Sequence, residues 1–488
     1  MEDRIDRSWQ SFALLAFLLL ASCIAWWSFF YGHTIDDAGI SFVYARNLAL
    51  GYGAVYHPGF APVEGFSNPV WTVLLSVFYF LGFENLPHIA SILGLGFYFL
   101  ALLLILYYGF SQLFPSLLFL CLVQLPLGPY WAVTGLENGL FSFLLCGCYL
   151  SYKKKEFTLL YSVLPVLILS RPEAILYALV FSIFHKDARK VILHCLIFFG
   201  FITLFRIFYF HDILPNTIWA KRGLVHSTGF IQNFLLGLQY ILDFLRLNFG
   251  FSIWVIPVLI YLFVKRQFLL LLLFASHVLL LSLSGGDWMR GFRLISPFVP
   301  LGIYVLTQSI WALVTSFKEM VPFKLIIVLN LIFLLWFHWY EVAKRLDLPY
   351  IELEERSRRG HKIEAMLKSL QVKEPVLMDA EAGGTAWATE MKVCDMAGLT
   401  DQQFAHSRKR PYDFTAYLVR CKPHAIYTIG FWTKVSGFSK EAKIYSDYFP
   451  AQSQEYFGER GEALLLHRSL QEAWSRKLQQ GNPGKSTQ

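Results

Sequence analysis

The chain has 488 residues, of which 56% are hydrophobic, 17% are aromatic and only 16% are charged. Its mean hydropathy of +0.48 excludes an ordinary soluble protein. The formal net charge of +8 comes from Lys and Arg near the ends of apolar stretches, so it indicates topology and lipid contact, with no nucleic-acid partner. Because residues 341–488 are polar enough to fold in water, we expect a transmembrane domain over 1–340 and a separate C-terminal domain over 341–488.

About eleven apolar stretches have lengths suited to crossing a bilayer. They are 11–30, 68–83, 88–110, 136–152, 157–170, 172–185, 190–210, 249–265, 267–284, 295–316 and 323–340. The first lacks a signal-peptide cleavage pattern, so we expect a retained helix. If the spans alternate, the basic loops Lys153–Lys155, Lys186–Lys190, Lys265–Arg266 and Lys318–Lys324 share one side, which the positive-inside rule makes cytoplasmic. The N-terminus then lies in the cytoplasm and the C-terminal domain outside.

Two kinds of segment complicate this alternation. Residues 115–134 are apolar, but a crossing there would place Lys153–Lys155 outside, so we expect a re-entrant segment on the outer face. Residues 40–48 and 228–247 carry apolar residues at helical spacing, with polar residues between them. We expect both to be helices that lie on the outer membrane surface.

The C-terminal part alternates between helical and strand-like patterns. We expect helices at 352–370, 385–389 and 413–420, and strands at 376–378, 392–394, 425–429 and 463–466. The fold class is therefore an all-α polytopic membrane domain with a small C-terminal α/β domain, whose end at 481–488 is expected to be disordered. Its two cysteines, Cys394 and Cys421, would pair only in an oxidising compartment, and no metal-binding spacing is present.

Asp36 and Asp37 directly follow the first apolar stretch and begin a helical pattern. One interpretation is structural, with Thr34 capping the helix and both carboxylates complementing its dipole. The other is functional, because a carboxylate pair at a bilayer surface is costly to keep without a use. The local sequence leaves both open.

Further polar clusters are predicted on the same outer face. They contain His57, Glu64 and Asn68; Glu137 with Arg171 and Glu173; Asn216 with Lys221 and Arg222; and Asp287, Trp288, Arg290 and Arg293. Each cluster alone is compatible with turns, snorkelling cations or an aromatic belt. Because ionisable groups at membrane depth usually mark a site, several clusters at one depth favour a functional site.

These clusters resemble the motifs of the GT-C superfamily of integral-membrane glycosyltransferases, nearest to the branch with the mycobacterial terminal arabinofuranosyltransferases. The similar runs are Asp36–Leu48, Val63–Trp71, Gly135–Asn138, Ser170–Glu173, Leu214–Thr217 and Gly285–Arg293. In the tail, Asp379–Gly383 and Asp395–Asp401 are similar to the periplasmic domain of that branch. The chain departs from the pattern at Asn138, where Thr is common, and at Glu381–Ala382.

The resemblance implies a GT-C fold and a donor made of one sugar on a polyprenyl phosphate. The acceptor would be a hydroxyl of a cell-envelope glycan, such as lipopolysaccharide, at the outer face of a bacterial inner membrane. Asp36 or Asp37 would be the general base, with Asp36 preferred because it comes first in the acidic motif and is nearer the membrane exit.

The resemblance also assigns expected roles to the remaining polar residues. Arg171, Lys221, Arg290 and Arg293 would bind the donor phosphate, with Lys221 and Arg293 preferred. The substrate pocket would include His57, Glu64, Asn68, Glu137, Glu173, Asn216, Asp287 and Trp288. No organic cofactor is expected, although a carboxylate pair can also hold Mg²⁺ or Ca²⁺.

Two other functions remain as alternatives. A transporter or flippase of a lipid-linked sugar would also need ionisable residues at membrane depth, but we find no inverted repeat of the kind such carriers use. An oligosaccharyltransferase would be expected to carry a Trp-Trp-Asp motif in its soluble domain, whereas Trp26–Trp27 lies in the first span.

Overall fold

The computed structural model describes residues 9–224, 230–248, 252–287, 289, 291–316, 352–407, 414–430, 433, 437–451 and 462–481. Up to residue 316 these residues form helices and no strand. The helices are α1 (Trp9–Phe29), α2 (Asp36–Ala49), α3 (Pro69–Phe80), α4 (Leu86–Gly109), α5 (Leu113–Leu122), α6 (Leu127–Val133), α7 (Asn138–Lys154), α8 (Phe157–Ser170), η1 (Pro172–Ala174), α9 (Ile175–Phe184), α10 (Ala188–Tyr209), α11 (Asn216–Leu224), α12 (Phe230–Leu247), α14 (Val255–Val264), α15 (Phe268–Leu283), η3 (Ser296–Phe298) and α16 (Val299–Ser316).

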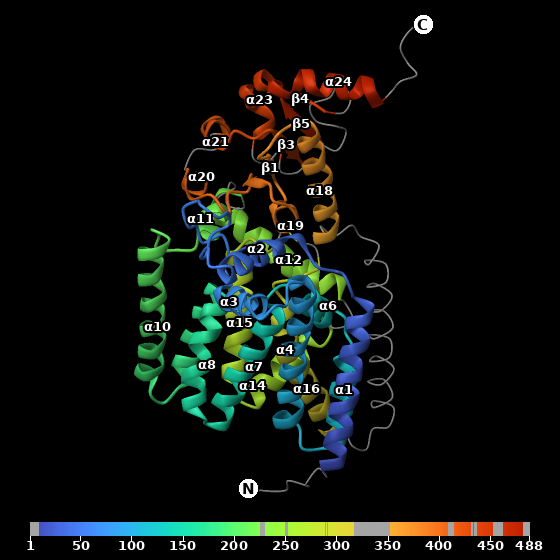
Figure 1. The fold of residues 1–488 in the computed structure, drawn as a ribbon. Coiled ribbons are helices and arrows are strands. Elements are labelled where there is room, and N and C mark those ends of the chain that lie inside the picture. Colours follow the sequence, from blue (N-terminus) through green and yellow to red (C-terminus); the bar gives the residue numbers. More distant parts are fainter. Residues whose placement is uncertain are drawn as a thin grey trace.

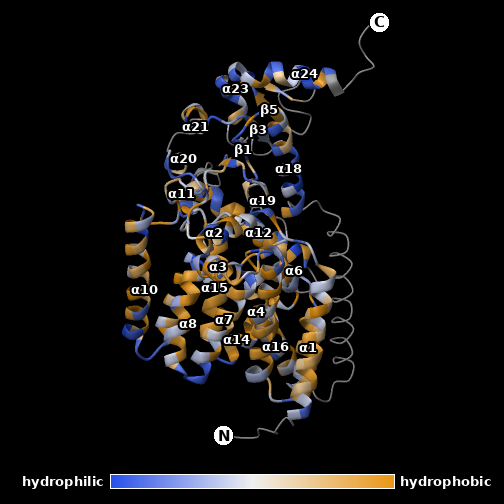
Figure 2. Ribbon diagram, viewed as in Figure 1, coloured by the Kyte–Doolittle hydropathy of each residue, from blue (hydrophilic) through white to orange (hydrophobic). Residues whose placement is uncertain are grey.

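Apolar helices form a bundle, and the C-terminal domain covers one end of it (Figure 1). Four helical segments within the described residues are long and apolar enough to cross a membrane: α1, α4, α10 and the combined η3–α16 segment. The helices α3, α8, α9, α14 and α15 are apolar but shorter. Figure 2 shows the apolar residues along the bundle and more polar residues in the covering domain. The expected span 323–340 lies outside the described residues.

The centre of the bundle is the contact between α4 and α7, which pack closely because both carry glycine. A Cβ added to Gly139 would lie 1.9 Å from the backbone oxygen of Gly94. A residue with a side chain at this position would therefore force the two helices apart. Around it, one large core cluster includes Trp71, Tyr98 and Trp131. Polar residues described below stand just before the first residues of α3 and α7.

Several segments compare directly with the expectations from sequence. The helix α8 covers residues 157–170, as expected, and α12 presents exposed apolar residues such as Phe230 and Ile231. Within 115–134, α5 and α6 are bent by 60° at a short break, a geometry shared by broken spans and re-entrant loops.

The apolar face of α2 is covered by protein, so it is not free to lie on lipid as expected for residues 40–48. Its apolar residues Ile40, Val43 and Tyr44 are buried in a cluster that includes Ala386 and Val393 of the C-terminal domain. An amphipathic helix needs only some apolar partner, and here the second domain supplies it. The capping role that one interpretation gave to Thr34 is wrong, because the residue before α2 is Ile35 and no side chain caps this helix.

The C-terminal domain is built on a five-stranded mixed sheet with the strand order β2-β1-β3-β5-β4. Its strands are β1 (Val376–Asp379), β2 (Lys392–Asp395), β3 (Ala425–Thr428), β4 (Tyr448–Pro450) and β5 (Ala463–His467). The strand β1 pairs in parallel with β2 and β3, whereas β5 is antiparallel to β3 and β4. The sequence had predicted the positions of four of these strands but not β4.

Helices cover both faces of this sheet. They are α18 (Leu353–Ser369), α19 (Ala382–Ala388), α20 (Gln402–His406), α21 (Phe414–Cys421), η4 (Phe438–Lys440), α23 (Ala442–Asp447), η5 (Arg468–Leu470) and α24 (Gln471–Gly481). Alternate residues of β1 face opposite sides, so Met378 belongs to the core with α21 and Leu377 to the core with α18. The expected α/β architecture is therefore present, and residues 482–488, expected to be disordered, lie outside the described residues.

Candidate functional site

Polar side chains gather where the apolar helices meet the C-terminal domain. Asn68 directly precedes α3, Glu137 precedes α7 and Arg171 precedes η1. All three are buried. Because the polar residues stand at helix ends, the apolar length of each helix remains available for packing against lipid or its neighbours.

Arg293 connects two carboxylates in this region. Its Nε and Nη2 donate to Asp287 Oδ2 and Oδ1 at 2.9 and 3.0 Å, and its Nη1 donates to Asp37 Oδ2 at 3.2 Å. The Asp287 side chain is 3% exposed, whereas that of Asp37 is 33% exposed. The backbone oxygen of Arg293 accepts from Asn138 Nδ2 at 3.0 Å, which ties this loop to the start of α7. Arg293 thus orients Asp37 while leaving part of its carboxylate accessible.

Arg171 occupies a similar position between Glu137 and Glu173. Its Nη1 lies 3.0 Å from Glu137 Oε1, and its Nε donates to Glu173 Oε1 at 2.5 Å. The second oxygen of Glu137 accepts from Asn68 Nδ2 at 2.6 Å, and Asn68 Oδ1 accepts from Ser41 of α2 at 3.2 Å. This chain of bonds links α2, α3, α7 and η1 in one network, and buried networks that are fully paired fix geometry.

Lys221 of α11 differs from the two arginines because the residue is exposed, although the surrounding protein removes enough water from its ammonium to lower its pKa. Among the described residues, no carboxylate lies within ion-pair distance of its ammonium. Its charge nevertheless interacts with those of Arg171, Arg293, Asp37 and Asp287, which places it beside the network. Lys221 is therefore a cation that can meet an incoming anion without first breaking a described ion pair.

Asp36 faces away from this network, toward the C-terminal domain. Its two carboxylate oxygens accept from the backbone N–H groups of Gly383 at 3.3 Å and Gly384 at 2.6 Å, at the start of α19. Asp36 is only 5% exposed. Burial raises its pKa to about 6, against the opposing effect of the Gly384 N–H. Asp36 thus satisfies free backbone donors of α19, a helix 347 residues away in the sequence.

The same two helices meet again at their other ends. Arg46 Nη1 donates to the backbone oxygen of Trp387 at 2.9 Å, in the last turn of α19. At the first contact a Cβ on Gly383 would lie 1.9 Å from the backbone oxygen of Asp36. The helices α2 and α19 therefore run side by side with a carboxylate at the start and a guanidinium near the end of α19, as the helix dipole favours.

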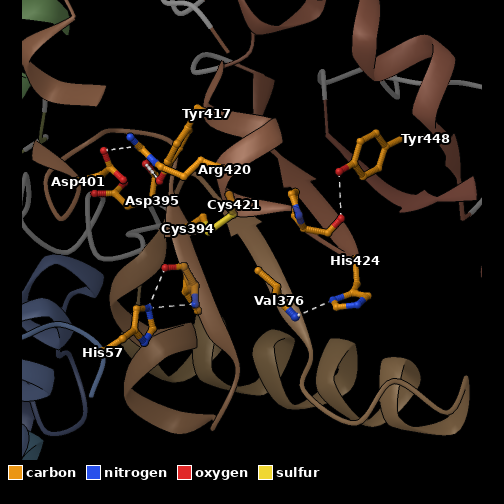
Figure 3. The surroundings of a disulfide bond; sticks show 12 residues. His57, Val376, Cys394, Asp395, Asp401, Tyr417, Arg420, Cys421, His424 and Tyr448 are labelled. Carbon is orange, nitrogen blue, oxygen red and sulfur yellow. Dashed lines mark hydrogen bonds and ion pairs between the residues drawn. A yellow bond between two sulfur atoms is a disulfide. The ribbon is translucent and has the colours of Figure 1, made fainter. Parts of the chain in front are cut away.

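Two other predicted pocket residues, His57 and Asn216, also serve this domain contact, whereas Glu64 is paired within the helical bundle. His57 Nε2 accepts from Val393 N at 3.1 Å (Figure 3), and burial lowers the pKa of His57 to about 4, so its ring is neutral at pH 7. Asn216 Nδ2 donates to the backbone oxygen of Leu399 at 2.7 Å. Glu64 is bound by both Nε and Nη2 of Arg206, at 2.6 and 2.9 Å, with both side chains buried. These residues support the site rather than line its accessible part.

The parallel strands β1 and β2 both end on the side of the sheet that faces the helical bundle. Asp379 ends β1 and precedes α19, and Asp395 ends β2 and begins the loop that receives Asn216. Asp395 is buried, which raises its pKa to about 7 although backbone N–H groups oppose the shift. Cys394, the residue before it, forms a disulfide with Cys421 of α21 (Figure 3), with Cα atoms 6.5 Å apart. The disulfide thus fixes the strand end beside this loop.

The remaining predicted residues are not described. Trp288 and Arg290, together with the side chain of Arg222, lie outside the described residues. Within the described ranges, no group of three or more His, Cys, Asp or Glu side chains could hold a metal ion. Sequence reasoning missed Arg46 and Arg206, since a single cation inside or beside an apolar stretch carries no signal of its partner.

No family model and no curated protein matches the sequence of this chain.

Proposed function

We propose that the protein is an integral-membrane glycosyltransferase of the GT-C type. It transfers one sugar from a polyprenyl phosphate to a hydroxyl group of a cell-envelope glycan, at the outer face of a bacterial inner membrane. The observation that carries this proposal is the half-buried carboxylate of Asp37, held by Arg293, beside Lys221, a cation that has no carboxylate partner among the described residues. Such a site offers a base, an anion-binding charge and an adjacent surface for a lipid tail.

Asp37 is the general base in this mechanism. An acceptor hydroxyl forms a bond to the anomeric carbon while its proton passes to a carboxylate oxygen of Asp37. The bond between the anomeric carbon and the phosphate oxygen breaks, and polyprenyl phosphate leaves with the electron pair. Partial exposure lets the hydroxyl approach, and the contact with Arg293 fixes the direction of the carboxylate.

Asp36, which the sequence favoured as the base, is better suited to positioning. Both of its oxygens accept backbone N–H groups, so an acceptor hydroxyl would have to displace a domain contact to reach it. Asp36 and Asp37 are adjacent at the start of α2, so docking of α19 on the first carboxylate orients the second.

The leaving phosphate gains negative charge as the bond breaks, and a preorganised cation stabilises that change. Lys221 is suited to this role because it is exposed and has no carboxylate partner among the described residues. Arg171 and Arg293 are each paired with two carboxylates, so their charges are already largely compensated. We therefore assign phosphate binding to Lys221 and positioning to the arginines.

Two features support the proposed location. The helix α7 begins beside Glu137 and ends at Lys154, so the basic residues 153–155 stand at the opposite end from the site. Basic loops favour the cytoplasmic side, which leaves the site and the C-terminal domain outside. A disulfide between Cys394 and Cys421 is also suited to an oxidising compartment.

The position of the network also favours an enzyme over the alternative of a transporter or flippase. A carrier places its substrate site near the bilayer midplane, between repeats that rock against each other. Here Asn68, Glu137 and Arg171 stand at helix ends, and the second domain is bonded to the same region.

The test uses the full-length protein in nanodiscs with a polyprenyl-phosphate sugar and an acceptor glycan, with product followed by mass spectrometry. We expect Asp37→Asn to lower turnover by about 10² to 10⁴, because Asn keeps the shape but loses basicity. Asp187→Asn is the matched control, since Asp187 lies on the other side of the bundle at the start of α10 and is paired with Lys190. Full turnover by Asp37→Asn would refute the assignment of the base.

A second arm tests the phosphate site. Lys221→Gln should raise the KM for the donor by about tenfold, the effect of losing one close charge of about 1.4 kcal/mol. The KM for the acceptor should stay unchanged. If the donor KM is unaffected, Lys221 does not bind the phosphate. A different result would identify a transporter: lipid-linked sugar crosses the bilayer, but neither sugar transfer nor donor hydrolysis occurs with any donor.

A further inference from the structure

A cavity with two cations in a largely apolar lining lies at the end of the bundle opposite the Asp37 and Arg293 cluster. It has a volume of about 190 Å³, and its lining includes Tyr152, Lys153, Phe184, Arg266, Gln267 and Phe268. These residues come from the end of α7, the end of α9 and the turn between α14 and α15. Since α7 has 17 residues from Asn138 to Lys154, its length places this cavity about 25 Å from the start of that helix. The cavity is therefore separate from the Asp37 network.

Two cations from different elements line this cavity. Within the described residues, neither Lys153 nor Arg266 has a carboxylate at ion-pair distance. Lys153 Nζ donates to the Tyr304 hydroxyl at 2.6 Å and lies 5.1 Å from the centre of that ring. Tyr152 OH donates to the backbone oxygen of Phe184 at 2.8 Å and closes the cavity between α7 and α9. The positive charge is thus held in place without being neutralised.

The turn that carries Arg266 has a strained backbone. Arg266 has a φ of +52°, in the left-handed region that non-glycine residues seldom adopt. Its N–H donates to the backbone oxygen of Phe263 at 3.0 Å, and Gln267 N–H donates to that of Leu262 at 2.7 Å. Lys155, close in the chain to the other cation of the cavity, has a positive φ of 63° as well, so both cations stand beside sharp turns that end a helix.

The mouth of the cavity adjoins an apolar surface. Phe263 and Val264, in the last turn of α14, and Phe268, at the start of α15, are exposed, and the rings of Phe263 and Phe268 are 6.0 Å apart. A ligand that fits this combination has a compact anionic group for the cavity and an apolar part for the adjoining surface. Such a combination is typical of a phospholipid, and basic pockets between membrane helices on the cytoplasmic side bind anionic headgroups.

We propose that this cavity binds the phosphate headgroup of an anionic phospholipid, with Lys153 and Arg266 as the charged contacts and the acyl chains along Phe263 and Phe268. The proposal does not depend on the function of the Asp37 network. It identifies a lipid site on the face that carries the basic loops, at the opposite end of α7 from the network.

The test is a lipid titration of the full-length protein in detergent, read by native mass spectrometry. The probes are phosphatidylglycerol, zwitterionic phosphatidylcholine with the same acyl chains, and inorganic phosphate. We expect phosphatidylglycerol to bind about 25-fold more tightly than phosphatidylcholine, because each of the two cations near an anionic lipid contributes roughly a fivefold gain. Arg266→Gln and Lys153→Gln should each reduce that preference by about fivefold.

Lys265→Gln is the matched control, because Lys265 is the neighbouring cation and does not line the cavity. It should bind phosphatidylglycerol like the wild type. Equal binding of the two lipids, or unchanged binding by Arg266→Gln, would overturn the proposal. Displacement of the lipid by equimolar inorganic phosphate would also overturn it, since the site would then serve a free anion. Arg266 is exposed in a turn, so its variant keeps the test decisive even if Lys153→Gln fails to fold.

Discussion

The contact between Asp36 and α19 makes the docking of the C-terminal domain dependent on pH. In the docked protein the pKa of Asp36 is raised from 3.8 to about 6, chiefly by burial. The docked state therefore holds the proton more tightly than the undocked state. This contribution to stability is complete below the ordinary pKa and is lost as the pH rises through the docked pKa. Acidification from neutral pH should thus strengthen docking until about pH 4.

The size of this effect follows from the shift. With values of 3.8 and about 6, the linkage relation gives a loss of roughly 1.4 kcal/mol in docking free energy between pH 5 and pH 7.5, about tenfold in the opening constant. Asp36→Asn cannot titrate, so it should lack this part of the dependence. The variant also places an amide NH₂ against one of the two N–H donors, which costs about 1 to 3 kcal/mol for a buried group left unpaired.

The assay is hydrogen exchange of the full-length protein followed by mass spectrometry, on peptides that cover Ala382–Ala388. Exchange rates corrected for intrinsic pH dependence give the opening constant of α19 at pH 5 and pH 7.5. We expect the ratio between the opening constants of wild type and Asp36→Asn to change by about tenfold between these two pH values. Comparison at each pH cancels most of the contribution of other groups, such as Asp395, whose pKa burial raises to about 7. A difference that stays constant with pH would refute the buried-carboxylate reasoning.

Three further outcomes are expected. Gly383→Ala puts a Cβ against the backbone oxygen of Asp36 at 1.9 Å, so it should lower the thermal midpoint of the protein by several degrees, whereas Gly200→Ala, with open space around it, should not. Arg293→Lys should lower kcat by about 10- to 100-fold with little change in donor KM, because an ammonium cannot span both carboxylates, and equal kcat values would contradict its positioning role. Cys421→Ser should destabilise the C-terminal domain by about 2 to 4 kcal/mol in denaturant unfolding, and insensitivity to this change would mean that the disulfide does not constrain the unfolded chain.

The sequence predicted the local elements better than the partners of polar residues. Periodicity and apolar length located α8, α12 and four of the five strands, because these depend on residues close in the chain. The burial of α2 was not predicted, since an apolar helix face has the same pattern whether it meets lipid or protein. The acceptor role of Asp36 was also missed, because its donors, Gly383 and Gly384, lie in a distant segment.

The candidate site shows the same limit. Composition and resemblance selected Asp37, Arg171 and Arg293, which the structure connects through shared carboxylates or neighbouring charges. They did not separate accessible residues from buried ones, and His57 and Glu64 turned out to bind other protein groups. Accessibility depends on packing between two domains, which no single stretch of sequence records.

The contact between α2 and α19 also sets an order of events during synthesis of the protein. Residue 36 is synthesised long before residue 384. Asp36 and Asp37 therefore lack their docking partner while the helices between them and the C-terminal domain form. Only when the last domain has folded do Gly383 and Gly384 reach Asp36. An incomplete chain, or one whose final domain stays unfolded, therefore lacks the contact to Asp36, and under the proposed function it would lack the oriented Asp37 as well.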